Sequence, residues 1–411
     1  MYSPIIKSQY HSGAATALVV ALLSHPLGAR AIDLGFGDWQ AHGFLSQGYT
    51  YTSGNDFFGN SQGDGSLEFT ELGMNVLGHP FPNLLLAVQG IYRDTGGSDE
   101  EDFRLDYANL DYHLDFGDAT TAGVRLGRVK NPIALYNETR DAIWTRPGVT
   151  LPQSIYFDAA GFRAPEIASD GGILYGRYRF GEHALSAEFL VAEPLDNIGG
   201  APAFLAGPNT QGTLGGRPLY IGRAGYEWRE GRVRLLFSAV DLDRDFESSS
   251  PSMPSGNIKA FAPFVSAQVN LESWSFTSEY ERISLKRTGL FPPPSPKFLR
   301  ENTTESYYFQ AEYRFMPRWS ALARYDVFYG NADDHDGSAM ARVTGLPRYR
   351  FFAKDLTFGL RWEFASDWLI AAEYHNVHGT GWLSPVDNPQ LDSDGGDGHW
   401  DLLAVMLSYR F

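Results

Sequence analysis

The stretch that decides the fold is WDLLAVMLSYRF, which occupies residues 400–411. Large apolar side chains recur at every second position of this stretch, Leu403, Val405, Leu407, Tyr409 and Phe411, whereas Ser408 and Arg410 fall on the other face. Alternation with a period of two is typical of a β-strand with one apolar face. A strand that crosses a bilayer shows it over about ten residues, because one face meets lipid and the other a polar interior. The stretch therefore predicts a membrane-spanning strand.

Two further stretches show the same alternation. They are Tyr307, Phe309, Ala311, Tyr313 and Phe315 against Gln310, Glu312 and Arg314, and Leu356, Phe358, Leu360, Trp362 and Phe364 against Thr357, Arg361 and Glu363. A soluble β-sandwich is the competing interpretation, but it would not expose so many aromatic residues in register on outward faces. Only a closed barrel satisfies every backbone hydrogen bond of such strands in lipid.

Seven short turns, most of them edged by aromatic residues, set the expected number of strands. They lie at 79–82, 116–118, 180–182, 228–231, 271–274, 315–319 and 364–368. Aromatic side chains favour the interface of a bilayer, so we place these turns at the periplasmic surface. Seven turns and two periplasmic termini predict an all-β fold, a 16-stranded antiparallel transmembrane β-barrel that forms one domain over residues 32–411.

Longer polar segments join the other strand ends, and we expect them to be extracellular loops. They lie near 53–66, 94–102, 131–170, 194–217, 243–257, 286–304, 330–353 and 379–399.

The N-terminus has the pattern of a secretory signal peptide, with Lys7, an apolar stretch over 14–23 and the small-x-small run Ala29-Arg30-Ala31. We expect residues 1–31 to be cleaved and the remainder to reach the cell outer membrane. Loss of the two basic residues Lys7 and Arg30 would change the net charge from −16 to −18. Nucleic acid is therefore not an expected partner. The chain has no cysteine, which excludes disulfides and thiolate chemistry.

The longest of the polar segments, 131–170, carries the resemblance to a known family. The run RLGRVKNP at 125–132, continued by NETRD at 137–141 and TRPG at 145–148, resembles the strand-to-constriction segment of the phosphate-selective type of Gram-negative outer-membrane porin. The C-terminal aromatic residue Phe411 is similar to the one that these proteins present to their assembly machinery. The resemblance implies a homotrimer in which the third loop folds into each barrel and narrows a water-filled pore.

Charged residues on both sides of the predicted pore are candidates for its constriction. Arg128 and Lys130 are expected to share a face of the strand before the loop, and Arg177 and Arg179 a face of the strand after it, with Arg104 on the preceding strand. Opposite this basic wall we place the loop residues Glu138, Arg140, Asp141, Arg146 and Asp158, together with Arg163, Glu166 and Asp170.

A basic wall facing an acidic loop would create a transverse field that favours dipolar solutes. The alternative is that these charges pair with one another and hold the loop in place. Phosphate-selective relatives use many lumenal Arg and Lys groups, and this loop has few, so we expect a wide or moderately selective channel with a slight anion preference.

The resulting hypothesis is passive diffusion of small hydrophilic solutes and ions, without a cofactor, a metal site or an enzymatic reaction. Outer-membrane lipid and lipopolysaccharide are the expected surroundings. One alternative is a barrel hydrolase, because His375 and Glu373 share a strand face, but no nucleophile is identifiable beside them. Another is an adhesin or receptor with a closed lumen. The carboxylate-rich segments 333–336 and 387–397 are expected to be solvated or to bridge lipopolysaccharide through divalent ions.

Overall fold

The computed structural model describes residues 31–35, 37–97, 102–158, 163–197, 201–206, 211–251 and 253–411. The expected signal peptide, residues 1–31, lies outside this part of the chain except for Ala31. Within the described residues, no helix is long and apolar enough to cross a membrane.

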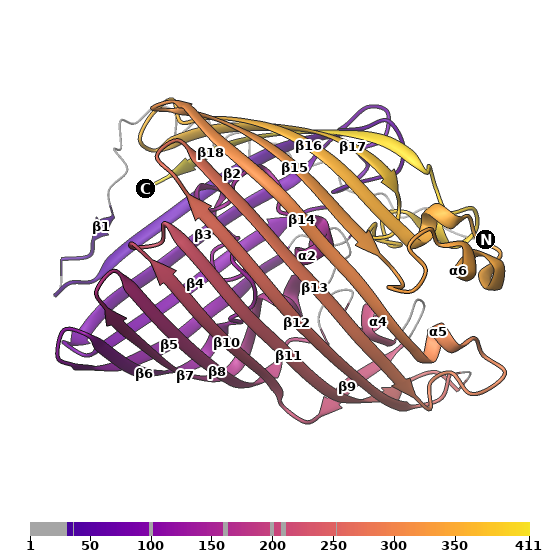
Figure 1. The fold of residues 1–411 in the computed structure, drawn as a ribbon, viewed down its shortest axis with the longest axis horizontal. Helices are drawn as coiled ribbons and strands as arrows, with labels where there is room; N and C mark the ends of the chain where they lie inside the picture. The colour runs from indigo at the N-terminus through magenta and orange to yellow at the C-terminus, as the bar shows by residue number, and fades with distance from the viewer. Residues whose placement is uncertain are drawn as a thin grey trace, which may run out of the picture.

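Sixteen long antiparallel strands form a closed barrel, which confirms the predicted fold (Figure 1). They are β2 Gln40–Thr52, β3 Ser66–Phe81, β4 Leu84–Asp94, β5 Asp102–Phe116, β6 Thr120–Lys130, β7 Ala168–Phe180, β8 His183–Pro194, β10 Leu219–Trp228, β11 Val233–Ser248, β12 Gly256–Asn270, β13 Trp274–Thr288, β14 Glu301–Met316, β15 Trp319–Tyr329, β16 Phe352–Trp362, β17 Trp368–Gly379 and β18 His399–Arg410. The last strand closes the ring by pairing with the first, so that Tyr409 lies opposite Leu45. Two short strands extend the sheet, β1 Ile32–Asp33 beside β2 and β9 Gly212–Gly216 beside β11.

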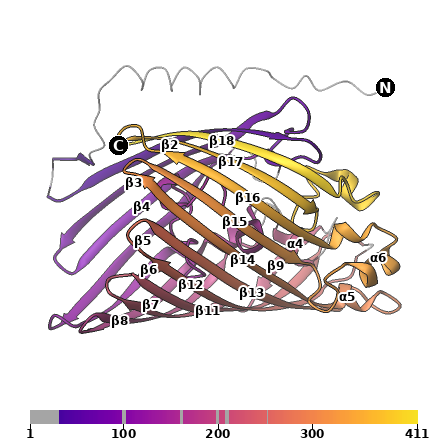
Figure 2. The ribbon, with the colours of Figure 1, turned by 45° about the horizontal axis from the view of Figure 1, so that its top comes forward.

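Short helices occupy the long connections between strands. They are η1 Ile143–Thr145, α2 Gln153–Tyr156, α3 Arg163–Ile167, α4 Ala201–Ala206, α5 Lys297–Arg300, α6 Ser338–Thr344, η3 Arg348–Phe351 and η4 Pro389–Asp392. Figure 2 shows α5 and α6 together at the end of the barrel where the long connections lie.

The seven predicted turns join consecutive strands at the opposite end, and pairs of aromatic rings line this end of the barrel. Ring centroids are 4.4 Å apart for Trp274 and Tyr313, 4.9 Å for Trp319 and Trp362, and 6.4 Å for Tyr409 and Phe411. The rings form the girdle that the turn sequences predict, because aromatic side chains are stable at the edge of a bilayer.

Exposure alternates along the strands as predicted for the outward face. Phe309 is 60 % exposed, whereas its neighbour Gln310 is 4 % exposed. The inner face of β18 is more apolar than expected: Leu402, Ala404 and Met406 are all buried. They are covered from inside the barrel by side chains of the long connections, including Trp382.

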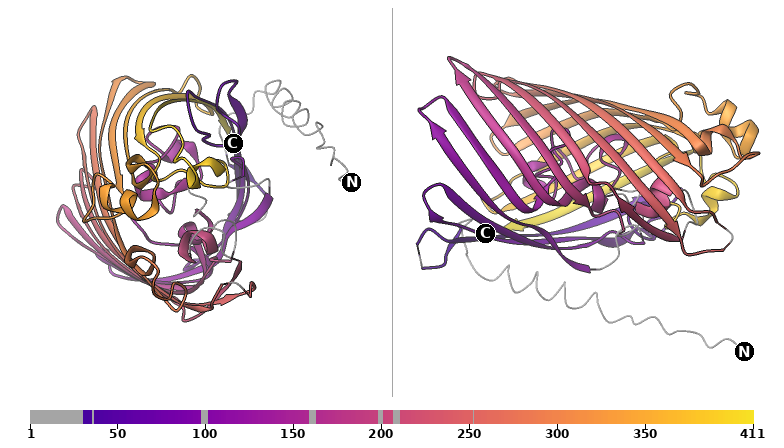
Figure 3. Two further views of the ribbon diagram at one scale, coloured as in Figure 1. Left: turned by 90° about the vertical axis from the view of Figure 1, so that its right-hand side faces the viewer. Right: turned by 90° about the horizontal axis from the view of Figure 1, so that it is seen from below.

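The longest connection runs from 131 to 167, and its described residues, 131–158 and 163–167, lie inside the ring of strands, as the end-on view in Figure 3 shows. It is three residues shorter than the predicted 131–170. Ala168 to Asp170 belong to β7, because Ala168 pairs with Lys130 and Asp170 with Arg128. We call residues 131–167 the inner loop.

Candidate pore constriction

The inner loop reaches strands on the far side of the barrel through hydrogen bonds. Its backbone N–H groups donate from Ala134 to Ser238 Oγ at 3.2 Å, from Leu135 to Glu279 Oε1 at 2.8 Å and from Thr150 to Glu373 Oε2 at 2.9 Å. The acceptors stand on β11, β13 and β17. Because the side chains that receive these bonds point inward, the loop is fixed across the lumen rather than over its mouth.

Most charges of the loop are buried in ion pairs. Asp141 contacts both Lys130 and Arg163, and Arg163 also contacts Asp158 at 2.8 Å. Burial opposes ionisation, but the charges of Lys130 and Arg163 outweigh it and hold the pKa of Asp141 well below its ordinary value. These side chains join the root of the loop to its later half.

Two more buried pairs hold the loop. Arg140 donates to Glu166 Oε2 at 3.1 Å, and Arg146 contacts Glu71 of β3, which also accepts from Arg93 at 3.1 Å. Burial raises the pKa of Glu166 to about 8, although Arg140 acts in the opposite direction. Of the constriction residues expected on the loop, Arg140, Asp141, Arg146 and Asp158 are therefore structural contacts, as the pairing alternative anticipates.

Glu138 is different, because its partners stand on the barrel wall and remain partly accessible. Its carboxylate lies 2.5 Å from Arg223 of β10 and 3.9 Å from Arg125 of β6. Arg223 also contacts Glu188 of β8 at 2.5 Å, and Arg125 contacts Asp111 of β5 at 3.0 Å. We call these five residues the charged cluster.

The side chains of the charged cluster remain partly accessible inside the barrel, although that of Asp111 is only 10 % exposed. The exposed fractions are 27 % for Glu138, 28 % for Arg125 and 14 % for Arg223. By contrast, the side chains of Arg140 and Asp141 are 0 % and 5 % exposed. The cluster is thus the place where the inner loop and the wall face each other across accessible space.

The expected basic wall needs correction at Arg128. Val129, the next residue, is fully buried in the interior, whereas Leu126, two residues before Arg128, is 46 % exposed on the outer surface. Arg128 therefore lies on the outer face, where it donates two hydrogen bonds to Asp170 at 2.7 and 2.8 Å. Lys130 lies in the interior, but its ammonium group donates hydrogen bonds to Asp106 at 2.6 Å and to Asp141.

Arg177 and Arg179 do face the interior, but far from the root of the loop. They lie at the short-turn end of β7, about 30 Å along the strand from Ala168 at roughly 3.3 Å per residue. Arg177 pairs there with Glu227 at 2.5 Å. Arg104 also faces inward, since it pairs in register with Ile91, which is 1 % exposed.

Known protein families and curated sequences do not match this chain, but solved structures do. The anion-selective porin from Comamonas acidovorans aligns with a TM-score of 0.54 at 12% identity, covering 91% of this chain and 99% of that one. The outer membrane channel DcaP of Acinetobacter baumannii aligns with a TM-score of 0.54 at 12% identity, covering 94% and 100%. In its trimer form, the in-vitro folded outer membrane protein OmpT of Vibrio cholerae aligns with a TM-score of 0.55 at 11% identity, covering 91% and 99%.

The chain has the porin fold. The sequence did not single out four residues of the charged cluster, which stand on four different strands: Asp111, Arg125, Glu188 and Arg223. Each lies at an inward position of its strand, so the alternation alone marks it as lumenal. Their meeting with Glu138 depends on the path of the inner loop, for which the sequence carries no periodic signal.

The residues of the hydrolase alternative form a buried cluster beneath the inner loop. His375 Nδ1 lies 2.7 Å from Asp355, and its Nε2 lies 3.4 Å from Glu373. The nearby loop hydroxyls bond to carboxylates instead: Thr150 Oγ1 donates to Glu373 at 3.0 Å and Ser154 donates to Asp326. The arrangement fixes the loop to β15–β17 and presents no hydroxyl to Nε2 among the described residues.

Two carboxylates of the 333–336 segment bond to protein groups. Asp334 accepts the backbone N–H groups of Ala339 and Met340 at 2.9 Å, which caps α6. Asp336 pairs with Arg348 at 3.4 Å. Within the described residues, no three His, Asp or Glu side chains are grouped so as to hold a metal ion.

Proposed function

We propose that the protein is an outer-membrane porin through which small hydrophilic solutes and ions diffuse passively. The route passes between the inner loop and the wall formed by β5–β8 and β10, and the charged cluster is its constriction. The accessibility of this cluster carries the proposal, because side chains that are 10–28 % exposed inside a closed barrel leave room for water beside them. Neither a cofactor nor a covalent reaction has a role in this function.

The charge of the constriction sets the expected selectivity, because a water-filled pore selects by its fixed charge as well as its radius. Glu138, Glu188 and Asp111 outnumber Arg125 and Arg223. We therefore expect a slight preference for cations. This differs from the anion preference expected from the sequence, because Arg128 no longer counts toward the lumen.

Charge-neutralising variants test the selectivity in planar bilayers with a salt gradient. Glu138→Gln should shift the reversal potential toward anion preference, and Arg223→Gln should shift it in the opposite direction. Arg128→Gln is the matched control, because it removes an arginine from the outer face of β6, and its reversal potential should equal that of the wild type. Equal potentials for all four proteins would remove the charged cluster from the conducting route.

A homotrimer is the assembly that we propose. The support is the trimer form in which the OmpT neighbour was solved, together with the resemblance of the 125–148 segment. Mass measurement in detergent before and after heating distinguishes the trimer from a single barrel.

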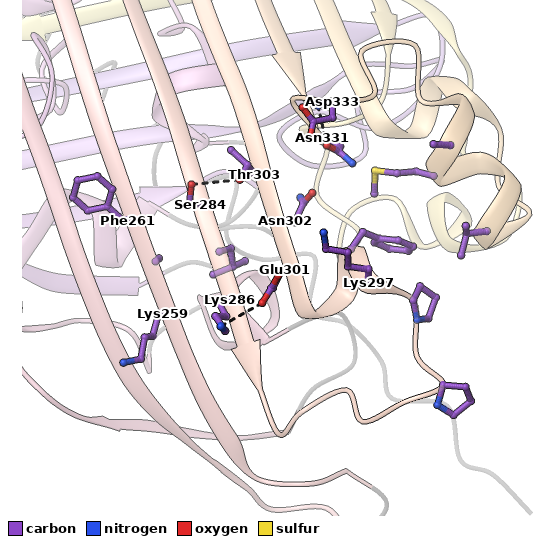
Figure 4. A pocket seen from close by; sticks show the side chains of 18 of the residues that line it. Lys259, Phe261, Ser284, Lys286, Lys297, Glu301, Asn302, Thr303, Asn331 and Asp333 are labelled. Carbon is purple, nitrogen blue, oxygen red and sulfur yellow. Dashed lines mark hydrogen bonds and ion pairs between the residues drawn. The ribbon is translucent and has the colours of Figure 1, made fainter.

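One part of the outer surface, at the long-loop end, has the chemistry to bind lipopolysaccharide. A hollow of about 920 Å³ lies at the long-loop end between β12–β14, α5 and α6. Lys259, Lys286 and Lys297 border it, as Figure 4 shows, and Lys259 and Lys286 are 57 % and 60 % exposed. Exposed ammonium groups beside the outward Phe261 suit the phosphate groups and acyl chains of such a lipid.

A further inference from the structure

An internal cavity of about 90 Å³ lies between the inner loop, α4 and the inner faces of β10–β13. Most of its lining is apolar and includes Phe157, Phe204, Leu242, Ala262 and Phe264. A single water needs only about 10–15 Å³ of such space, so the cavity has room for more than a solvent molecule.

Glu281 of β13 lines this cavity and is only 2 % exposed. Its Oε2 atom is buried and has no hydrogen-bond partner among the described residues. An isolated buried carboxylate is costly, because it loses its hydration without gaining a partner.

The next inward carboxylate on the same strand, Glu279, shows what a satisfied group looks like here. It accepts hydrogen bonds from Ser266 at 2.6 Å, Tyr156 at 2.7 Å, Tyr308 at 2.8 Å and the Leu135 N–H at 2.8 Å. Glu279 and Glu281 thus differ, although they lie two residues apart on the same face of β13. The Glu279 carboxylate accepts four hydrogen bonds, whereas the Glu281 carboxylate borders the cavity and its Oε2 atom accepts none from the described residues.

Water is a poor occupant of this cavity, since a buried water needs two to four polar partners. The other polar residues of the lining already have partners: Glu166 bonds to Arg140 at 3.1 Å, Asp196 pairs with Arg244 at 2.8 Å, and the Asn131 amide donates to the carbonyl oxygens of Pro165 and Glu166 at 3.0 Å. An occupant that suits the site has an apolar body for the walls and a cationic donor for Glu281.

We propose that this cavity binds a small organic cation, a primary ammonium group on a short alkyl chain or a single ring, with the ammonium on Glu281. The inference depends on the proposed function only for the route by which the ligand enters the lumen. Binding itself requires the cavity and the carboxylate, and it can be measured without conduction.

Calorimetric titration of the refolded protein in a neutral detergent, with n-pentylamine as the probe, tests the proposal. Pentan-1-ol and pentanoate have the same chain with a neutral and an anionic end. We expect the ammonium to bind at least tenfold more tightly than the alcohol and pentanoate not to bind. Glu281→Gln should weaken amine binding at least tenfold, whereas Glu272→Gln, which removes a carboxylate from a short turn, should leave it unchanged.

Heat-modifiable gel mobility verifies that each variant forms a barrel, and Ala262→Leu, which fills the cavity, should weaken binding of amine and alcohol alike. Equal binding of amine and alcohol, or of amine to wild type and Glu281→Gln, would reduce the site to an unselective apolar hollow and overturn the proposal. Absence of amine binding would overturn it too. Channel activity without amine binding would refute this inference alone, and amine binding without channel activity would refute the proposed function alone.

Discussion

At the scale of residues, the loop charges divide into those that hold the loop and those that face water. Arg146 belongs to the first kind, because its side chain is 2 % exposed and contacts the fully buried Glu71. Removing one partner of a buried ion pair costs about 3–5 kcal/mol, since the other charge is left buried. Arg146→Ala should therefore release the middle of the inner loop.

Hydrogen exchange of the loop amides measures this release, and faster exchange over 143–150 is the expected result. Arg217→Ala is the control, because Arg217 is 74 % exposed in its pair with Asp243 and such surface pairs contribute at most about 1 kcal/mol. Unchanged protection in Arg146→Ala would mean that other contacts suffice to hold the loop.

Arg125 and Arg128 show what the sequence can and cannot predict at this scale. Both belong to the segment that resembles the porin constriction, but they lie three positions apart and so point to opposite faces of β6. Because Leu126 points outward, the alternation along β6 places Arg125 on the inner face and Arg128 on the outer face, as the structure shows. Assigning Arg128 and Lys130 to one lumenal face fails because the strand ends at Lys130, whose side chain turns to Asp106 and Asp141.

At the scale of elements, the seam between β2 and β18 depends on a glycine. Gly43 and Phe411 exchange two backbone hydrogen bonds at 3.1 and 3.0 Å. A Cβ atom on Gly43 would lie 2.5 Å from the Phe411 ring, so Gly43→Ala must displace the ring that ends the aromatic girdle. Overpacking of this kind costs about 1–3 kcal/mol.

Urea unfolding followed by gel mobility should show a lower midpoint for Gly43→Ala. In Gly222→Ala the new methyl group meets no atom within 4 Å, so its midpoint should stay close to that of the wild type. A seam that tolerates Gly43→Ala as well as the control would show that Phe411 contributes little to closure.

Docking of the inner loop should depend on pH through Glu166. Burial raises its pKa in the folded protein to about 8 from 4.5, so the docked loop binds a proton that the undocked loop releases. The stabilisation of the docked loop by the protonated Glu166 is complete below about pH 4.5 and is lost as the pH rises to 8. Exchange over the loop should quicken across this window, and Glu166→Gln should flatten the change. A wild-type loop with the same protection at pH 5 and pH 8, after correction for intrinsic exchange, would contradict this account.

At the scale of the whole molecule, the alternation and the turns were enough to predict sixteen strands and the longest loop. Each signal is local, a period of two within one strand or an aromatic pair around one turn. The contacts across the lumen are not local. Glu279, Glu373 and Asp326 receive the inner loop from strands more than a hundred residues away. The sequence shows that Leu402 and Met406 are apolar, but what covers them on the inner face of β18 was equally beyond prediction, because it depends on how the long connections fold.

The central claim is that solutes pass between the inner loop and the wall at Glu138. Because the chain contains no cysteine, a single introduced thiol can be modified without background. The most direct measurement is single-channel current of Glu138→Cys in a planar bilayer, before and after a bulky water-soluble thiol reagent is added. We predict uniform current steps that shrink or close on modification, whereas Arg128→Cys on the outer face keeps its current. Steps that are unchanged by modification at residue 138, or a folded barrel that gives no steps, would contradict the account.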